Sequence, residues 1–426
     1  MYNASRLTDQ RLGRDVAWNL APVVLLAVVG LGLKVLIAKW WDEAALGAFN
    51  LVTFVMMSTA ILGAGGLQYA VLRAVAEAPE DRARVAAVVV GALVPNVVLA
   101  AAATAVFVAV RHPIGDLLQS ETVAEGMLWA APALFCFAIN KVLLGVVNGL
   151  RRMRAFAVYT SLRYVLIAIG LGVCHGLRVP AAQLPMIWTI TEGTLLLVLV
   201  VELLATVSLA RAAGWVAHAK AQLAYGVRGV ASTLAWEVNS KLDLWMLAVL
   251  LHDDRLVGIY AMASALFEGA MQLPVVLQNN FNPLLARDLT QGRTQEIEAL
   301  ARRSRRWFVP ALVGACAIGA LVFPVVVPWL TGKASFGDGA VPFAILMAGV
   351  AIASPWLPFN QLLLMGSHPG WHTLYLSLVA LATFVVTLVL IPAYGLVGAA
   401  IANAAGLVIS ASLLIALART KLRVRI

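Results

Sequence analysis

Long apolar runs follow one another along the whole chain, and short polar stretches separate them. Most of these runs reach about 20 residues, the length that an α-helix needs to cross a bilayer. The pattern therefore predicts an all-α polytopic membrane protein with about twelve transmembrane helices. We expect them over residues 16–38, 44–68, 85–110, 123–149, 156–174, 186–209, 228–250, 256–281, 308–330, 341–364, 371–391 and 396–418.

Composition agrees with this pattern. Hydrophobic residues make up 62% of the 426 residues and charged residues only 12%, whereas soluble domains have roughly 25% charged residues. The net charge of +10 would suggest a nucleic-acid partner in a soluble protein. Here the basic residues lie in short loops, where membrane topology and anionic lipid headgroups explain them better. We therefore expect no nucleic-acid partner.

The basic residues concentrate in every second gap between the apolar runs. Such residues near span ends stay in the cytoplasm during insertion, so the pattern predicts that both termini are cytoplasmic. The gaps on this side contain, among others, Arg6, Arg11, Arg14, Arg73, Arg82, Arg84, Arg151, Arg152, Arg154, Arg302, Arg303, Arg305, Arg306, Arg419 and Lys421.

A weak internal repeat divides the chain. The segment 42–49 resembles 253–260, and 180–184 resembles 392–396 at nearly the same offset. Two such matches indicate two halves of six helices in the same orientation, which we place at residues 1–215 and 216–426. Parallel repeats of this kind are typical of transporters in which two bundles rock against each other to give alternating access.

Two polar or proline-rich segments interrupt the apolar pattern. Pro355-Trp356-Leu357-Pro358 is the strongest kink signal, because proline frees a backbone carbonyl and bends a helix. The segment 278–283, Gln-Asn-Asn-Phe-Asn-Pro, could line the cytoplasmic mouth of a cavity or cap the end of a helix, and a cap is favoured. The segment 282–307 is the longest expected connection.

Four basic residues lie inside the apolar runs: Lys34, Lys141, Arg163 and Lys241. A charge near the bilayer centre costs about 2.5–3.5 kcal/mol on insertion scales, and such residues usually face a cavity or one another. Lys34 is close enough to the end of its run to reach the interface. Lys141 and Arg163 lie roughly 10–12 Å deep, where either snorkelling or a role in a substrate cavity is reasonable.

Acidic residues in the expected spans are the second set of candidates. Glu237 and Lys241 are four residues apart and can pair along one helical face, whereas Asp243 needs another partner. Lys241 could instead pair with Glu268, and Glu192 could reach the interface or pair with a cation. A surplus of carboxylates near the midplane is also a known way to carry protons or sodium ions.

No enzyme motif is found in the sequence. It contains neither a phosphate-binding Gly-Lys-Ser loop nor a His-Glu-x-x-His motif, so we expect no catalytic residues, metal or cofactor. Cys136, Cys174 and Cys316 lie in apolar runs without paired spacing and are predicted to be core residues.

Several local features resemble the Wzx-type polysaccharide (O-antigen) flippases of the multidrug/oligosaccharidyl-lipid/polysaccharide (MOP) exporter superfamily. They are Leu46-Gly47-Ala48-Phe49-Asn50, Val257-Gly258-Ile259-Tyr260-Ala261, Ser240-Lys241-Leu242-Asp243, the loop from Asn148 to Arg154 and the hairpin from Tyr394 to Ala400. The resemblance implies a V-shaped, two-lobed helical bundle in the bacterial inner membrane. It also implies a polyprenyl-pyrophosphate-linked oligosaccharide substrate, moved to the periplasmic leaflet for surface polysaccharide biosynthesis.

Under this interpretation the buried cations would pair with the pyrophosphate. Lys141, Arg163 and Lys241 are the first candidates, followed by Lys34. Asp243, Glu237, Glu268 and Glu192 are candidates for ion coupling or for counter-ions. An ion-coupled exporter of cationic drugs and a membrane glycan polymerase or ligase are the alternatives. Expected partners are the lipid-linked substrate and membrane lipids, and partners from a polysaccharide-assembly pathway stay open.

Overall fold

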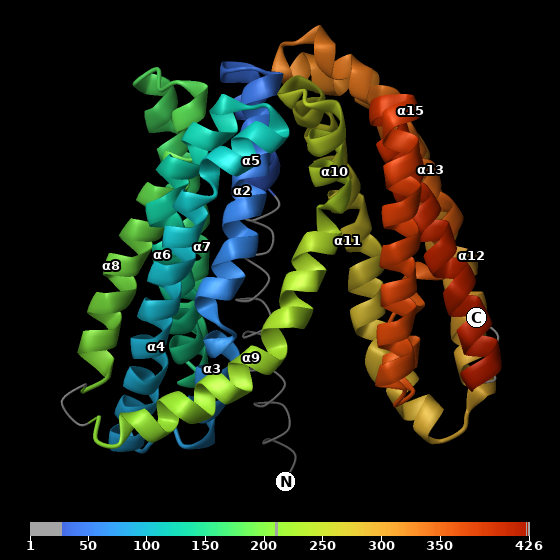
Figure 1. Ribbon diagram of the computed structural model, residues 1–426. Coiled ribbons are helices and arrows are strands. Elements are labelled where there is room, and N and C mark those ends of the chain that lie inside the picture. Colours follow the sequence, from blue (N-terminus) through green and yellow to red (C-terminus); the bar gives the residue numbers. More distant parts are fainter. Residues whose placement is uncertain (1–27, 209–211, 423, 425–426) are drawn as a thin grey trace. The chain divides into compact units, whose positions relative to one another are not determined.

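A computed structural model describes residues 28–208, 212–422 and 424, and within these ranges the chain is helical without strands (Figure 1). The all-helical prediction is therefore confirmed. Nine helices of the described residues are long and apolar enough to cross a membrane. The first expected span, 16–38, lies partly outside the described residues, and the count of twelve stays a prediction.

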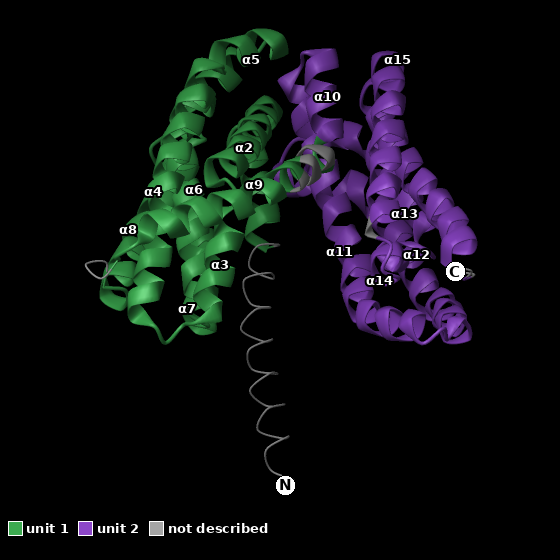
Figure 2. Ribbon diagram, turned by 60° about the horizontal axis from the view of Figure 1, so that its bottom comes forward, with its two compact units in different colours: residues 1–241 green, residues 242–426 purple. Residues whose placement is uncertain are grey.

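The chain forms two compact units, Met1–Lys241 and Leu242–Ile426 (Figure 2). The sequence-based boundary lay earlier, between residues 215 and 216. The segment in between is helix α9, which packs on α4, α3 and α2 and so belongs to the first unit. The N-terminal unit contains a helix over 28–40, α2 (Glu43–Ala64), α3 (Leu67–Glu77), α4 (Arg82–Ala109), α5 (Arg111–Leu118), α6 (Glu121–Gly149), α7 (Met153–Gly176), η1 (Ala181–Gln183), α8 (Met186–Thr206) and α9 (Trp215–Ser240).

Helix α6 is the central helix of this unit. It packs against α8, α2, α4 and α3, and most of its apolar stretch is buried. Leu143, Val146 and Val147 of α6 join Leu67 and Val89 in the core. The neighbouring α7 is mostly exposed within the unit, as expected for a helix with a lipid-facing side.

The C-terminal unit contains α10 (Leu242–Leu251), α11 (Asp254–Thr290), α12 (Thr294–Thr331), η3 (Ala334–Gly339), α13 (Ala340–Ala353), η4 (Leu357–Phe359), α14 (Leu362–Met365), α15 (Pro369–Leu417) and η5 (Ala418–Leu422). The expected kink at Pro355–Pro358 is confirmed, because α13 ends at Ala353 and a short 3₁₀ turn follows. The expected spans 371–391 and 396–418 both lie in α15 and meet at Gly395, whose φ is 56° and ψ is −128°.

One match of the sequence repeat, 42–49 with 253–260, corresponds to equivalent helix starts. Asp42 caps α2 by accepting a hydrogen bond of 2.7 Å from the Ala45 backbone N–H. Asp253 caps α11 in the same manner, through the backbone N–H groups of Arg255 and Leu256. Each carboxylate satisfies an N–H at the first turn that has no partner within the helix, so the repeated Asp has a local structural reason.

Three expectations were wrong in detail. The polar segment 278–283 does not cap a helix, because α11 continues through Pro283 to Thr290. The expected connection 282–307 is largely helical, since α12 already begins at Thr294. The helix expected over 228–250 is interrupted at Lys241, between α9 and α10.

Candidate functional site

Arg163 of α7 and Glu192 of α8 form a buried ion pair in the N-terminal unit. The Arg163 Nε lies 2.6 Å from Glu192 Oε1, and a terminal guanidinium nitrogen donates to Oε2 at 3.1 Å. The Glu192 side chain is fully buried, and that of Arg163 is 13% exposed. Arg163 is ten residues from the start of α7 at Met153, roughly 15 Å along the helix. Glu192 thus pairs with a cation in the structure, and its role in ion coupling or as a counter-ion during transport stays a prediction.

Asn140 of α6 fixes the acidic partner of this pair. Its side-chain amide donates to both the backbone oxygen and the Oε2 of Glu192, each at 2.9 Å. Asn140 is fully buried, and its side-chain oxygen accepts no hydrogen bond from the described residues. Two hydrogen bonds from one amide fix the position of Glu192, so its carboxylate is held in place as the partner of Arg163.

Lys141 is the neighbouring cation on α6. Its ammonium lies 4.9 Å from the centre of the Phe137 ring, and the Arg163 guanidinium lies 5.0 Å from the same ring. Glu237 of α9, Arg163 and Glu192 are near enough for their charges to act on Lys141. Within the described ranges, however, no carboxylate forms an ion pair with Lys141. We call Phe137, Asn140, Lys141, Arg163 and Glu192 the Arg163 cluster.

The Arg163 cluster is suited to bind an anion. Glu192 is ion-paired with Arg163, while the direct contact of the Lys141 ammonium is with the face of the Phe137 ring, an interaction worth about 0.5–2 kcal/mol. A phosphate oxygen beside Lys141 would gain a charge-assisted hydrogen bond and face a second cation nearby. Four of the eight residues predicted from the sequence, Lys141, Arg163, Glu192 and Glu237, are thus brought into one region of the unit.

Asp243 of α10 is at the centre of a second polar cluster, in the C-terminal unit. Its Oδ2 accepts hydrogen bonds from the Tyr260 hydroxyl at 2.8 Å and from the Asn403 amide at 2.9 Å. Its Oδ1 accepts from the Leu244 backbone N–H at 2.8 Å. Asp243 thus accepts hydrogen bonds from three donors of the C-terminal unit, and its role in ion coupling stays a prediction. We call Asp243, Tyr260 and Asn403 the Asp243 cluster.

The remaining candidates, Glu268, Lys241 and Lys34, belong to neither cluster. Glu268, one turn beyond Ser264 on α11, accepts a long hydrogen bond of 3.4 Å from the Ser264 hydroxyl. Lys241 lies at the break between α9 and α10, and Lys34 lies in the helix over 28–40, where both are half-buried. The roles predicted for these residues stay predictions.

Sequence reasoning missed Phe137, Asn140, Tyr260 and Asn403. Asn140 is adjacent to Lys141 in an apolar run, and Asn403 is similarly isolated in its run. Single amides in such runs could have been noticed, because a buried amide needs partners. Phe137 and Tyr260 give no comparable signal in a chain this rich in apolar residues.

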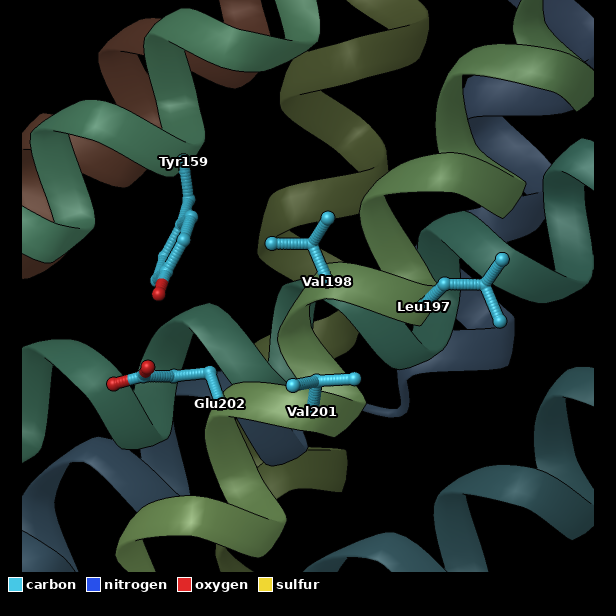
Figure 3. A pocket seen from close by; sticks show the side chains of 5 residues that line it. All are labelled: Tyr159, Leu197, Val198, Val201 and Glu202. Carbon is cyan, nitrogen blue, oxygen red and sulfur yellow. The ribbon is translucent and has the colours of Figure 1, made fainter.

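A pocket of about 330 Å³ lies between α7 and α8, away from the predicted site residues. Figure 3 shows Tyr159 of α7 and Glu202 of α8 on one side of it, with the apolar Val198 and Val201 beside them. Glu202 also forms an ion pair with Arg152, the residue before α7. Apart from Tyr159 and Glu202, the lining of the pocket is apolar.

Comparisons with known proteins identify the fold. No model of a protein family matches the sequence, and no curated protein matches it. Among solved structures, a lipid II flippase MurJ in an inward closed conformation is 12% identical with a TM-score of 0.74, over 95% of this chain and 88% of that one. An inward-facing multidrug resistance MATE transporter of the MOP superfamily is 14% identical with a TM-score of 0.73, over 96% and 98%. A MOP superfamily transporter from Pyrococcus furiosus is 13% identical with a TM-score of 0.58, over 94% and 93%.

Identities this low show the fold alone. These structures match nearly the whole of this chain, including both compact units. The chain therefore has the all-helical, polytopic fold of MOP-superfamily flippases and multidrug transporters.

Proposed function

We propose that the protein is a flippase that moves a polyprenyl-pyrophosphate-linked oligosaccharide across the bacterial inner membrane. The single observation that carries the proposal is the position of Lys141, a half-buried cation eight residues before the end of α6 with no ion-pairing carboxylate in the described residues. A cation without a counter-ion is costly in a low-dielectric environment. An anionic substrate that supplies the counter-charge would offset this cost.

The ion pair beside Lys141 supports the same proposal. Arg163 is already balanced by Glu192, so the cluster does not carry two unpaired cations when it is empty. A pyrophosphate that enters has two charged groups and leaves water at a high cost. The Lys141 ammonium can pair with one phosphate, while the guanidinium can donate its remaining N–H groups to the other.

The structural comparisons support a transporter of this general class. One of the similar structures is a lipid II flippase, whose substrate is named as a lipid. The positive-inside pattern of the loops would place the termini in the cytoplasm. Transport would then run from the cytoplasmic leaflet to the periplasmic leaflet, as surface polysaccharide biosynthesis requires.

An ion-coupled exporter of drugs is the second candidate. The observation that favours it is the buried Asp243 of the second cluster, with Glu268 on the adjacent α11. Buried carboxylates can carry a coupling ion or attract a cationic drug. The similar MATE structures are multidrug transporters, and the P. furiosus protein is described as having a binding pocket of reversed polarity that suggests a different function. The polarity of the binding site is therefore the property that separates the two candidates.

A reconstituted transport assay tests the proposal. The purified protein is placed in liposomes containing a polyprenyl-pyrophosphate oligosaccharide with a fluorescent glycan, and a membrane-impermeant quencher reports the glycan that reaches the outer leaflet. Lys141→Gln should lower the initial rate by roughly tenfold, as expected for the loss of one charged hydrogen bond. Lys39→Gln, which changes an exposed lysine, is the matched control. Transport of a cationic dye with no glycan transport would favour the drug exporter.

A further inference from the structure

A cavity of about 590 Å³ lies between α11 and α12 of the C-terminal unit, apart from both clusters of buried charge. Its apolar walls come from Leu277 and Phe281 of α11 and from Leu300 and Phe308 of α12. Phe281 also packs on Phe359, with ring centres 5.5 Å apart, so this wall is part of the core of the unit. Packed side chains of the core therefore form and fix this wall of the cavity.

The cavity lies at the level of α12 where the helix would cross the membrane surface. This helix has 38 residues, so it is roughly 57 Å long and exceeds the roughly 30 Å hydrocarbon core. The segment 308–331 contains no charged residue, whereas the segment before it contains Arg302, Arg303, Arg305 and Arg306. Trp307 lies between the two segments and is 69% exposed. Tryptophan at such a boundary is typical of the headgroup level of a bilayer.

Two polar groups face this apolar cavity. Arg303 lines it and is exposed, so its guanidinium can meet a charged group at the surface. Ser304 also lines it, is only 5% exposed, and its hydroxyl has no hydrogen-bond partner among the described residues. A buried hydroxyl without a partner is unfavourable, because it has lost its hydrogen bonds to water. The cavity therefore combines a cation and an unused hydroxyl donor with apolar walls.

We propose that this cavity binds an anionic phospholipid of the membrane, with its phosphate on Arg303 and Ser304 and an acyl chain against Phe281 and Phe308. Charge complementarity selects this occupant. Arg305 and Arg306 lie on the same turns and raise the local positive potential, whereas Arg302 is near Glu298. The lipid would fill the space between α11 and α12 and stabilise the packing of the two helices. The site is independent of the transported substrate, because none of its residues belongs to the Arg163 cluster.

Native mass spectrometry and thermal unfolding of the full-length protein test this site. Phosphatidylglycerol should remain bound and raise the unfolding temperature, whereas phosphatidylcholine should do neither. Arg303→Gln should weaken phosphatidylglycerol binding roughly five-fold, since one basic residue at a membrane surface contributes about 1 kcal/mol. Ser304→Ala should weaken binding and leave the lipid-free unfolding temperature unchanged, because that hydroxyl has no partner to lose.

Arg302→Gln is the matched control, since Arg302 is adjacent, exposed and near Glu298 at 3.8 Å but does not line the cavity. Binding in this variant should stay within two-fold of the original. Equal losses in the Arg302 and Arg303 variants would show general attraction to the basic surface and overturn the proposal. Equal binding of phosphatidylcholine would overturn it too. Tighter binding of a polyprenyl phosphate at the same site would identify a substrate lipid as the occupant and would also contradict it.

Discussion

Arg163 and Glu192 are 29 residues apart in the chain, yet their side chains meet at 2.6 Å between α7 and α8. The acidic partner is fully buried and receives a further hydrogen bond from Asn140 on α6. The pair therefore connects three helices of the N-terminal unit through one carboxylate. Because Glu192 is engaged by Arg163, the neighbouring Lys141 is the cation that can bind a ligand.

The first prediction concerns this ion pair. Glu192→Gln leaves a buried guanidinium without its counter-ion, so the free energy of unfolding should fall by about 3–5 kcal/mol. The double variant Arg163→Met/Glu192→Leu removes both charges and should recover most of that loss. Thermal unfolding of the purified proteins measures both effects. If the double variant is as unstable as the summed effects of Arg163→Met and Glu192→Leu measured singly, the side chains are not coupled and our account of the pair is wrong.

The Asp243 cluster gives a second prediction. Tyr260→Phe removes one of the donors to a buried carboxylate and should destabilise the protein by about 1–3 kcal/mol. Combining it with Asn403→Leu should cost more than the sum of the single changes, because Asp243 would then retain only the Leu244 N–H. Tyr394→Phe is a suitable control, since Tyr394 is 61% exposed. Additive effects would show that the three side chains do not act together.

Close approach of backbones gives a third prediction. Gly226 of α9 lies against the turn between α2 and α3, and a side chain there would overlap the Gly65 carbonyl oxygen. Gly226→Ala should therefore destabilise the N-terminal unit by about 1–3 kcal/mol, as overpacking does. Gly229→Ala, one turn further along α9, meets no atom within 4 Å and should be neutral or stabilising by up to about 1 kcal/mol. Equal unfolding temperatures for the two variants would contradict this packing.

A fourth prediction concerns the break within α15. Gly395 has a φ of 56° and a ψ of −128°, a region that residues with a Cβ rarely adopt. The nearest atom to an added Cβ is Leu251 Cδ1 at 3.8 Å, so the cost of Gly395→Ala comes from the backbone rather than from a clash. We expect a loss of about 1–3 kcal/mol in stability. Gly314→Ala in α12, where nothing lies within 4 Å, should cost nothing, and a similar loss in both variants would exclude backbone strain.

The sequence predicts helix positions well where a strong local signal ends the helix. Residues 123–149 were expected and α6 spans Glu121–Gly149, because Ser120 caps its start. The expected span 308–330 was too short, since the basic segment before it continues the helix outside the apolar run. The break at Lys241 was missed because no proline or glycine marks it. Hydropathy defines the apolar part of a helix, but it does not predict how far the helix continues into the polar segments on either side.

The site was predicted only in part, for a physical reason. Charges within apolar runs indicated Lys141, Arg163 and Glu192 individually, since each is costly there. Their meeting on three helices depends on how each helix is rotated about its axis. Helices that are apolar on nearly all sides do not define that rotation through hydrophobic periodicity. Phe137 and Asn140 belong to the site for the same reason, through packing that only the folded unit shows.

The measurement that tests the central claim most directly is the dissociation constant of a polyprenyl pyrophosphate for the purified protein and for variants at Lys141. Lys141→Gln should weaken binding roughly tenfold or more, because a hydrogen bond to a charged group contributes about 1.5–3 kcal/mol. Lys141→Arg should retain most of the affinity, and Lys39→Gln should bind as the original protein does. Unchanged affinity in Lys141→Gln, with the protein still folded, would show that Lys141 does not bind the pyrophosphate and would contradict the proposed flippase site.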